Sequence, residues 1–153
     1  MKSSGKALGK RYSWFCGWVA FLLILPACVV AAQYDTGVHG RVIIATETTT
    51  DGQPVRYPKS DQGKITVMEV TVAPGAETGW HKHSVPVYAY VMAGTLSVSL
   101  KDGKTFEFTA GDAIIEVVDT FHNGINKRDT PVKLIVFYTG VKDVPNVIKA
   151  DQP

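Results

Sequence analysis

Cysteine is nearly absent from this chain of 153 residues. The two cysteines, Cys16 and Cys28, both lie within residues 1–32, so residues 33–153 can form no disulfide. The stability of this longer part must therefore come from a packed core or from a bound metal. A chain of that length forms one domain and can bury roughly two-thirds of the surface that it exposes when unfolded.

Acidic side chains are absent from residues 1–32, whereas four basic residues lie there: Lys2, Lys6, Lys10 and Arg11. Beyond residue 32 acidic residues slightly outnumber basic ones, and no basic stripe is present. This charge pattern argues against a nucleic-acid partner.

A long hydrophobic run is also missing, because the apolar stretch 14–25 is shorter than the roughly 20 residues that a membrane-spanning helix needs. Basic, apolar and then small residues in this order predict a signal peptide over residues 1–32, cleaved before Gln33. We therefore expect a periplasmic or secreted protein. Two alternatives remain: an uncleaved segment that anchors the protein in the membrane, or lipid attachment at Cys28, because residues 25–28 resemble a bacterial lipoprotein box.

Helical periodicity is not found in the remainder of the chain, which instead contains short β-branched or alternating segments separated by turn residues. Asp102-Gly103 is a strong hairpin signal between two of these segments. The pattern predicts an all-β sandwich or barrel with a loosely ordered tail from Gly140 onward. The expected strands cover residues 41–46, 64–73, 87–92, 95–100, 105–109, 113–118 and 132–138.

Histidine occurs four times, and two of the four, His81 and His83, stand two positions apart. Side chains at i and i+2 of an extended strand point to the same face, so both imidazoles can bind one metal ion. His122 is the natural third ligand if its strand lies beside this pair. His39 lies near the predicted start of the mature chain, and we assign it no role.

Glu116 interrupts the apolar run Ile114 to Val118. A carboxylate in such a strand is costly unless it is paired or bound to a metal. Four roles are open for Glu116: metal ligand, partner that orients a ligand, catalytic proton acceptor, or member of an ordinary ion pair.

Two histidine motifs in this chain resemble those of the cupin superfamily. The residues that fit the spacing of the first motif are Gly75, His81, His83 and Gly94, and those that fit the second are Gly111, His122 and Asn126. The chain departs from the second motif at Val117 and Asp119, where the family has Pro and Gly. It departs from the first where the family has a metal-binding Glu, because Val87 or Tyr88 stands there.

The resemblance implies a single-domain cupin β-barrel of the jelly-roll type over residues 33–153, with His81, His83 and His122 as ligands of a divalent metal ion such as Fe, Mn or Zn. It implies a metal-dependent, oxygenase-like enzyme that acts on a small oxygen-rich or phenolic molecule. Glu116, which stands out by its apolar surroundings and fits no position of the motifs, is the candidate catalytic residue. The alternative is a non-catalytic module that binds a small ligand or a metal. A homodimer is a further expectation. Trp80, Tyr88 and Tyr90 either line the pocket or pack in the core.

Overall fold

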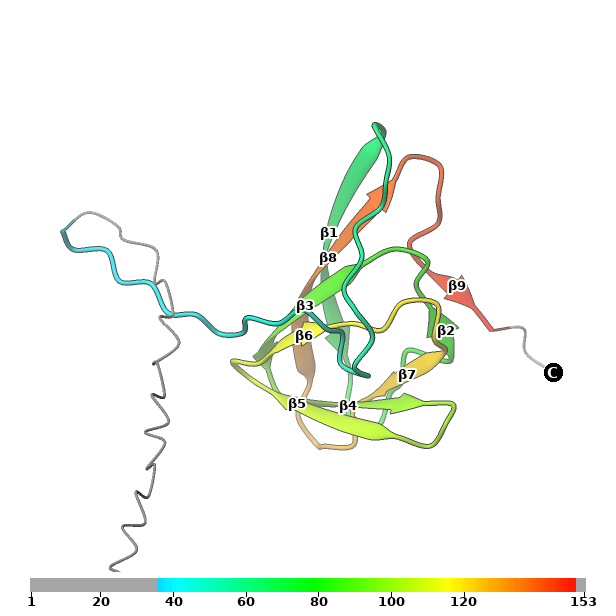
Figure 1. The fold of residues 1–153 in the computed structure, drawn as a ribbon. Coiled ribbons are helices and arrows are strands. Elements are labelled where there is room, and N and C mark those ends of the chain that lie inside the picture. Colours follow the sequence, from blue (N-terminus) through cyan, green and yellow to red (C-terminus); the bar gives the residue numbers. More distant parts are fainter. Residues whose placement is uncertain (1–35, 151–153) are drawn as a thin grey trace, which may run out of the picture. The chain divides into compact units, whose positions relative to one another are not determined.

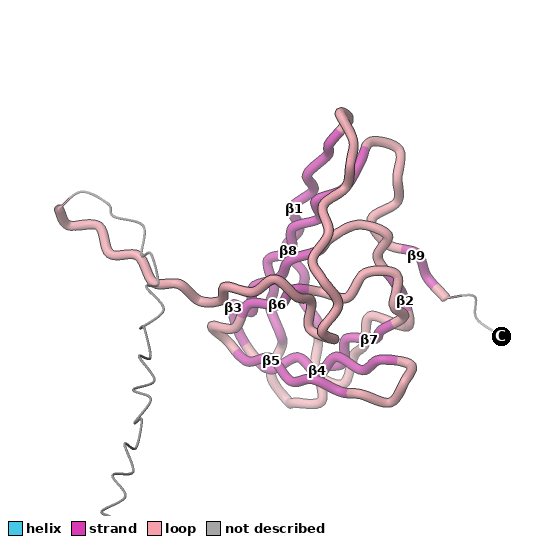
Figure 2. Tube along the Cα trace, in the orientation of Figure 1, coloured by secondary structure: helices cyan, strands magenta, loops and turns pink. Residues whose placement is uncertain are grey.

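The computed structural model describes residues 36–150, so the predicted signal segment 1–32 lies outside the described residues. Strands and loops account for all of this part, as Figure 2 shows, and none of it is helical. No helix within residues 36–150 is therefore long and apolar enough to cross a membrane. The nine strands of this part are β1 (Gly63–Val72), β2 (His81–Lys82), β3 (Val87–Ala93), β4 (Thr95–Leu100), β5 (Thr105–Thr109), β6 (Ala113–Ile115), β7 (His122–Ile125), β8 (Val132–Val141) and β9 (Ile148–Lys149).

The strands form two antiparallel sheets, which confirms the predicted all-β, jelly-roll-like fold (Figure 1). One sheet has the order β1-β8-β3-β6 and the other β5-β4-β7-β2-β9. In strand β8 every second residue from Val132 to Tyr138 is buried. This alternation is typical of a strand that has one face on the core and the other toward solvent. The buried core draws on both sheets and consists mainly of β-branched residues: Val72, Val85, Val87, Ala89, Val91, Leu96, Ile114, Val132, Leu134, Val136 and Tyr138.

Two glycines make the turns that hold these strands in place. Gly103 has a φ of 90° in the predicted hairpin between β4 and β5, and its N–H donates to the carbonyl of Leu100. Gly94, between β3 and β4, has a φ of 79°, and a Cβ there would lie 2.7 Å from the carbonyl oxygen of Pro131. Gly94 is therefore required both by its backbone conformation and by the close approach of another chain segment.

The strand expected at residues 41–46 is not formed, and Figure 1 draws this segment (cyan) without an arrow. Val42, Ile43 and Ile44 are exposed. The β-branched sequence has the propensity for a strand but does not pair with edge strand β6, because the N–H of Thr50 already bonds the carbonyl of Ile115 there. The prediction of a strand here was wrong for this single chain.

Two other boundaries differ from the sequence-based expectation. The strand expected at 113–118 ends at Ile115, and the chain then turns so that the N–H of Asp119, at a φ of 54°, donates to the carbonyl of His83. The tail expected to be loosely ordered instead contains β9, which pairs with β2. The tail has no strong strand pattern, but the free edge of β2 offers it backbone partners.

Candidate metal centre

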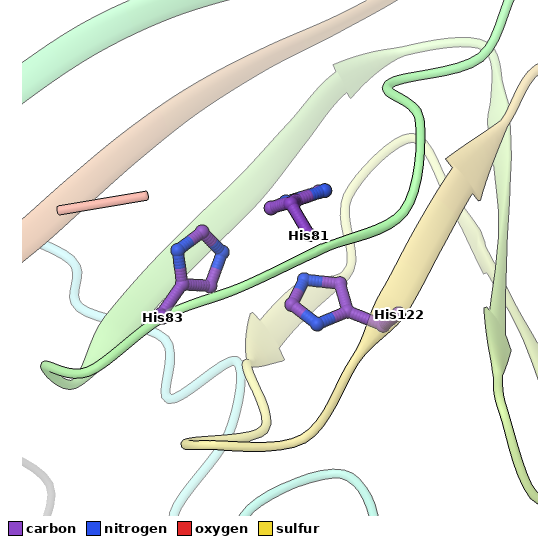
Figure 3. A group of neighbouring side chains, drawn as sticks. All are labelled: His81, His83 and His122. Carbon is purple, nitrogen blue, oxygen red and sulfur yellow. The ribbon is translucent and has the colours of Figure 1, made fainter. Parts of the chain in front are cut away.

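Three imidazoles meet at one end of the five-stranded sheet. His81 of β2 and His122 of β7 are directly paired in the register, and His83 follows β2 immediately. The ring centroids of His81 and His122 are 4.4 Å apart, and the ring of His83 lies 5.0 Å from each of them. Figure 3 shows the three rings beside one another. One ring nitrogen from each residue lies within 4.8 Å of the other two, so the structure brings the predicted ligands together.

Backbone carbonyls fix the tautomer of all three rings. The Nδ1 atoms of His81, His83 and His122 lie 2.8, 2.8 and 2.9 Å from the carbonyl oxygens of Gly79, Asn146 and Thr120, respectively. Because a carbonyl can only accept a hydrogen bond, each Nδ1 carries a proton, and the Nε2 lone pair is free to face the centre. Outer partners of this kind orient the histidine ligands of metal sites.

Glu116 completes the cluster. Its Oε2 lies 3.2 Å from the Nε2 of His83 and 3.2 Å from the Nε2 of His122. The N–H of Glu116 donates to the carbonyl of Val87 on the neighbouring strand β3. Val87 itself is buried in the core. The carboxylate thus enters the site from the segment beside Val87, which is one of the two positions, Val87 or Tyr88, where the cupin motif has its glutamate.

The charges of the cluster are coupled. Burial raises the pKa of Glu116, but the neighbouring imidazoles of His122 and His83 outweigh this effect and lower the pKa to about 2. Burial lowers the pKa of His122, but its contact with Glu116 prevails and raises it. Burial lowers the pKa of His81, and the neighbouring imidazoles act in the same direction. Without a metal, the cluster therefore holds an ionised Glu116 beside His122, and this carboxylate raises the pKa of that imidazole.

A divalent cation fits this donor set. The Nε2 of His122 is buried and has no hydrogen-bond partner within residues 36–150, although Glu116 is near. An unpaired buried nitrogen is costly, and a metal ion would satisfy it. Three imidazole nitrogens with one carboxylate suit Zn²⁺, Fe²⁺ or Mn²⁺. His81, His83 and His122 are the residues that would hold the ion.

A cavity of about 70 Å³ adjoins the cluster. The histidines and Glu116 form its polar wall, and the remaining lining is largely apolar: Val70, Leu96, Val98, Leu134, Val136 and Tyr138. The ring of Tyr138 lies edge-on to His83, with 5.7 Å between centroids. Burial, and then the charge of Glu116, raise the pKa of Tyr138, so its phenol stays neutral and can donate a hydrogen bond.

The aromatic residues singled out from the sequence lie elsewhere. Tyr88 is directly paired with Phe137, which is exposed, so both belong to the outer face of the sheet, as does Tyr90. Trp80 is exposed, with the Nζ of Lys101 5.9 Å from its ring. None of these three lines the cavity.

His39 is exposed and lies outside the cluster. Tyr138 was not predicted from the sequence to lie at the site. It lies two positions after buried Val136 in β8, so the alternation of the strand could have placed its side chain on the inner face. The role of the Asn146 carbonyl was not predicted either, and no sequence pattern reveals it.

Comparison with known proteins supports this reading of the fold. The profile of the Cupin domain family matches residues 68–138, which include the whole three-histidine cluster. No curated protein has a sequence that matches this chain. Among solved structures, the polyketide cyclase RemF from Streptomyces resistomycificus is similar with a TM-score of 0.51 at 21% identity, over 65% of this chain and 78% of that one.

Two looser likenesses involve proteins of different lengths. A cupin domain from Bordetella pertussis Tohama I is 27% identical over 57% of this chain and 99% of that one, with a TM-score of 0.46. An oxalate oxidase in complex with the substrate analogue glycolate is 21% identical over 55% of this chain, with a TM-score of 0.46. This chain spans 45% of the length of that oxidase.

Proposed function

Since this chain belongs to the cupin superfamily, we propose that it is an exported metalloprotein that binds one divalent ion through His81, His83 and His122. We further propose that it is a metal-dependent, oxygenase-like enzyme acting on a small molecule. One observation carries the proposal: three imidazoles, each with its Nδ1 bonded to a carbonyl, converge beside the half-buried carboxylate of Glu116. An ordinary core would not gather four ionisable groups without charge compensation.

A bound divalent ion would polarise a substrate oxygen, and iron or manganese would also allow chemistry with O₂. The chain's own residues have separate tasks. The three histidines hold the ion, and the carbonyls that accept from their Nδ1 atoms keep the rings in place. The Oε2 of Glu116 is ionised at neutral pH and can accept a proton from a substrate hydroxyl, or serve as a fourth ligand.

The cavity limits the substrate. About 70 Å³ holds a molecule of only a few non-hydrogen atoms beside the cluster unless side chains at its entrance move. An oxygen-bearing end would face the histidines and Glu116, and an apolar part would contact Val70 and Leu96. The neutral phenol of Tyr138 offers a hydrogen-bond donor for orienting the substrate. Small oxygen-rich molecules meet these requirements, and a phenolic molecule meets them once the side chains at the entrance move.

Export is part of the proposal and rests on the sequence of residues 1–32. The lack of cysteine beyond Cys28 leaves the mature domain without a thiol that an oxidising compartment could modify. N-terminal sequencing of the protein recovered from the producing cell tests this point. A chain that begins at Gln33 in the periplasm or medium supports export, and a chain that retains residues 1–32 in the cytoplasm contradicts it.

A non-catalytic module is the second candidate. Val87 or Tyr88 stands where the cupin motif has its glutamate, and the carboxylate of Glu116 comes instead from the residue that follows β6. A site altered in this way could hold a metal or a small ligand without turning it over. The fold itself does not decide between the two functions.

Metal analysis of protein purified from its native compartment is the first step in distinguishing the enzyme from the non-catalytic module. Reconstitution with Fe²⁺ or Mn²⁺ follows. Oxygen uptake with members of a panel of small phenols is the result expected of the enzyme. A metal-free protein that retains an organic ligand, or a loaded protein that consumes no O₂, would favour the binding module. Glu116→Gln should chiefly lower turnover if the carboxylate is a base, and chiefly weaken metal binding if it is a ligand.

A further inference from the structure

Strand β9 places a lysine beside the first histidine of the candidate metal centre. Lys149 of β9 is directly paired with His81 of β2, and the two strands lie side by side in Figure 1. The N–H of Ala150 donates to the carbonyl of Trp80, so the next pair, His81 with Lys149, is a non-hydrogen-bonded one. The side chains of such a pair project from the same face of the sheet and approach each other closely. The side chain of Lys149 therefore leaves β9 on the face that carries the ring of His81.

This face is open to solvent on the side of His81. His83 and His122 expose only 2% of their surfaces, whereas His81 is half-buried. Thr78, which also lines the cavity beside the cluster, is exposed, and so is Lys149. Solvent thus reaches the cavity along residues 78–81, which we call the rim. Lys149 lies next to the rim, and its flexible four-carbon stem lets the ammonium move over it.

The charge of Lys149 is available to a ligand. Lys149 takes part in none of the ion pairs found among residues 36–150. Lys82, the neighbour of His81 in β2, points to the opposite face, where its Nζ lies 3.3 Å from Asp119. Within the described part of the chain, no lysine or arginine lines the cavity itself. Lys149 is therefore a cation that an anion approaching the rim would meet.

Glu116 adds a charge of the opposite sign on the inner wall of the cavity. Its Oε2 lies 3.2 Å from the Nε2 atoms of His83 and His122. A second carboxylate placed against this wall would be repelled by Glu116, and its burial would be costly. At the rim, by contrast, a carboxylate keeps part of its hydration and gains the ammonium of Lys149. The two charges thus orient an anionic molecule with its carboxylate outward and its uncharged end toward the histidines.

We propose that Lys149 binds the carboxylate of a small hydroxy- or oxo-carboxylate, whose hydroxyl or oxo oxygen enters the cavity toward the three histidines. This inference rests on the proposed function and narrows its substrate class from oxygen-rich molecules in general to anions. The cavity of about 70 Å³ then has to hold only the uncharged end of the molecule. The carbon skeleton contacts Val70 and Val98, which are the half-buried members of the apolar wall.

Binding of small anions to the zinc-loaded full chain tests the proposal without any need for turnover. The probes are lactate and pyruvate, each compared by calorimetry with its neutral amide, lactamide or pyruvamide. Lys149→Gln removes the charge from an exposed side chain and leaves the backbone hydrogen bonds of β9 in place. This variant should bind both carboxylates roughly three- to ten-fold more weakly, as expected for a partly exposed ion pair, and should bind the amides unchanged. Lys149→Arg keeps the charge and should bind the carboxylates nearly as tightly as the unmodified protein.

Lys127→Gln is the matched control. Lys127 is an exposed lysine in the loop between β7 and β8, whereas His122 lies at the other end of β7. This variant loses the same charge and should bind the carboxylates like the unmodified protein. Added salt should weaken carboxylate binding to the unmodified chain more than to Lys149→Gln, because salt screens the ion pair.

Metal analysis of the same samples separates this inference from the proposed function. A chain that holds no zinc would contradict the metal site itself, and this inference with it. A zinc-loaded chain that binds neither carboxylate, or that binds each amide as tightly as its carboxylate, would overturn the role of Lys149 alone. Equal carboxylate affinities before and after Lys149→Gln would overturn it as well.

Discussion

Shortening the chain at its C-terminus should weaken metal binding, because the segment 145–150 supplies part of the site. The Nδ1 of His83 donates to the carbonyl of Asn146 over 2.8 Å. Other bonds hold the segment in place: the hydroxyl of Ser84 donates to the carbonyl of Pro145, and the N–H of Ala150 to that of Trp80. The informative variant is a chain that ends at Val144. Its matched control is a chain that ends at Ala150.

The size of the expected loss in metal affinity follows from the role of the Asn146 carbonyl. Without it, the ring of His83 can rotate and can carry its proton on Nε2, which is the nitrogen that faces the centre. Loss of such an outer partner lowers metal affinity by about 10- to 100-fold, or about 1.4–2.8 kcal/mol. The barrel should remain folded, because no residue of the buried core cluster lies in 145–150.

A competition titration with a chromophoric chelator measures the zinc affinity of both chains, and circular dichroism during urea unfolding checks that both are folded. The chain ending at Ala150 should bind zinc like the full-length protein, and the shorter chain should bind one ion more weakly. Equal zinc affinities for two folded chains would refute the role of the Asn146 carbonyl.

Two further predictions concern stability. In the metal-free protein, Glu116→Gln should lower the free energy of unfolding near pH 5–6 by at most about 3 kcal/mol, because the folded-state pKa of Glu116 is lowered from 4.5 to about 2. This stabilisation is complete above the pKa that Glu116 has in the unfolded chain, and it is lost as the pH falls toward 2. It should also shrink as the pH rises above the raised pKa of His122. Urea unfolding at a series of pH values measures it, and a difference independent of pH would contradict the ion pair. Gly94→Ala should destabilise the fold by about 2 kcal/mol or more, because its Cβ would meet the Pro131 carbonyl. Gly103→Ala, at a similar φ but with open space around it, is the control and should cost less; equal losses in thermal unfolding would show that the close approach is unimportant.

The sequence predicted those features that depend on local periodicity. Alternating apolar residues located β8 and the β4–β5 hairpin, and the two-residue spacing of His81 and His83 placed both rings on one side. His122 belongs to another strand, so the spacing within one strand could not predict that it lies beside them. The spacing of the second cupin motif predicted it. The structure then placed His122 directly opposite His81.

The features that escaped prediction depend on partners distant in the sequence. Residues 41–46 have strand propensity, but they pair with no strand of the described part of the chain. The segment 145–150 has little strand propensity, yet it pairs with β2 because that edge is available. The proximity of Glu116 to Val87 follows from the register of β3 and β6, which no local pattern encodes. Propensity describes a segment alone, whereas pairing depends on which edges remain open.

The amount of divalent metal bound per chain tests the central claim most directly. Equilibrium dialysis against zinc, followed by elemental analysis, should give one tightly held ion for the unmodified protein and for His39→Ala, in which an exposed histidine outside the cluster is replaced. His122→Ala should retain the fold but lose that ion. A protein that stays metal-free in excess zinc, or a His122→Ala variant that binds as much as the unmodified chain, would contradict the account.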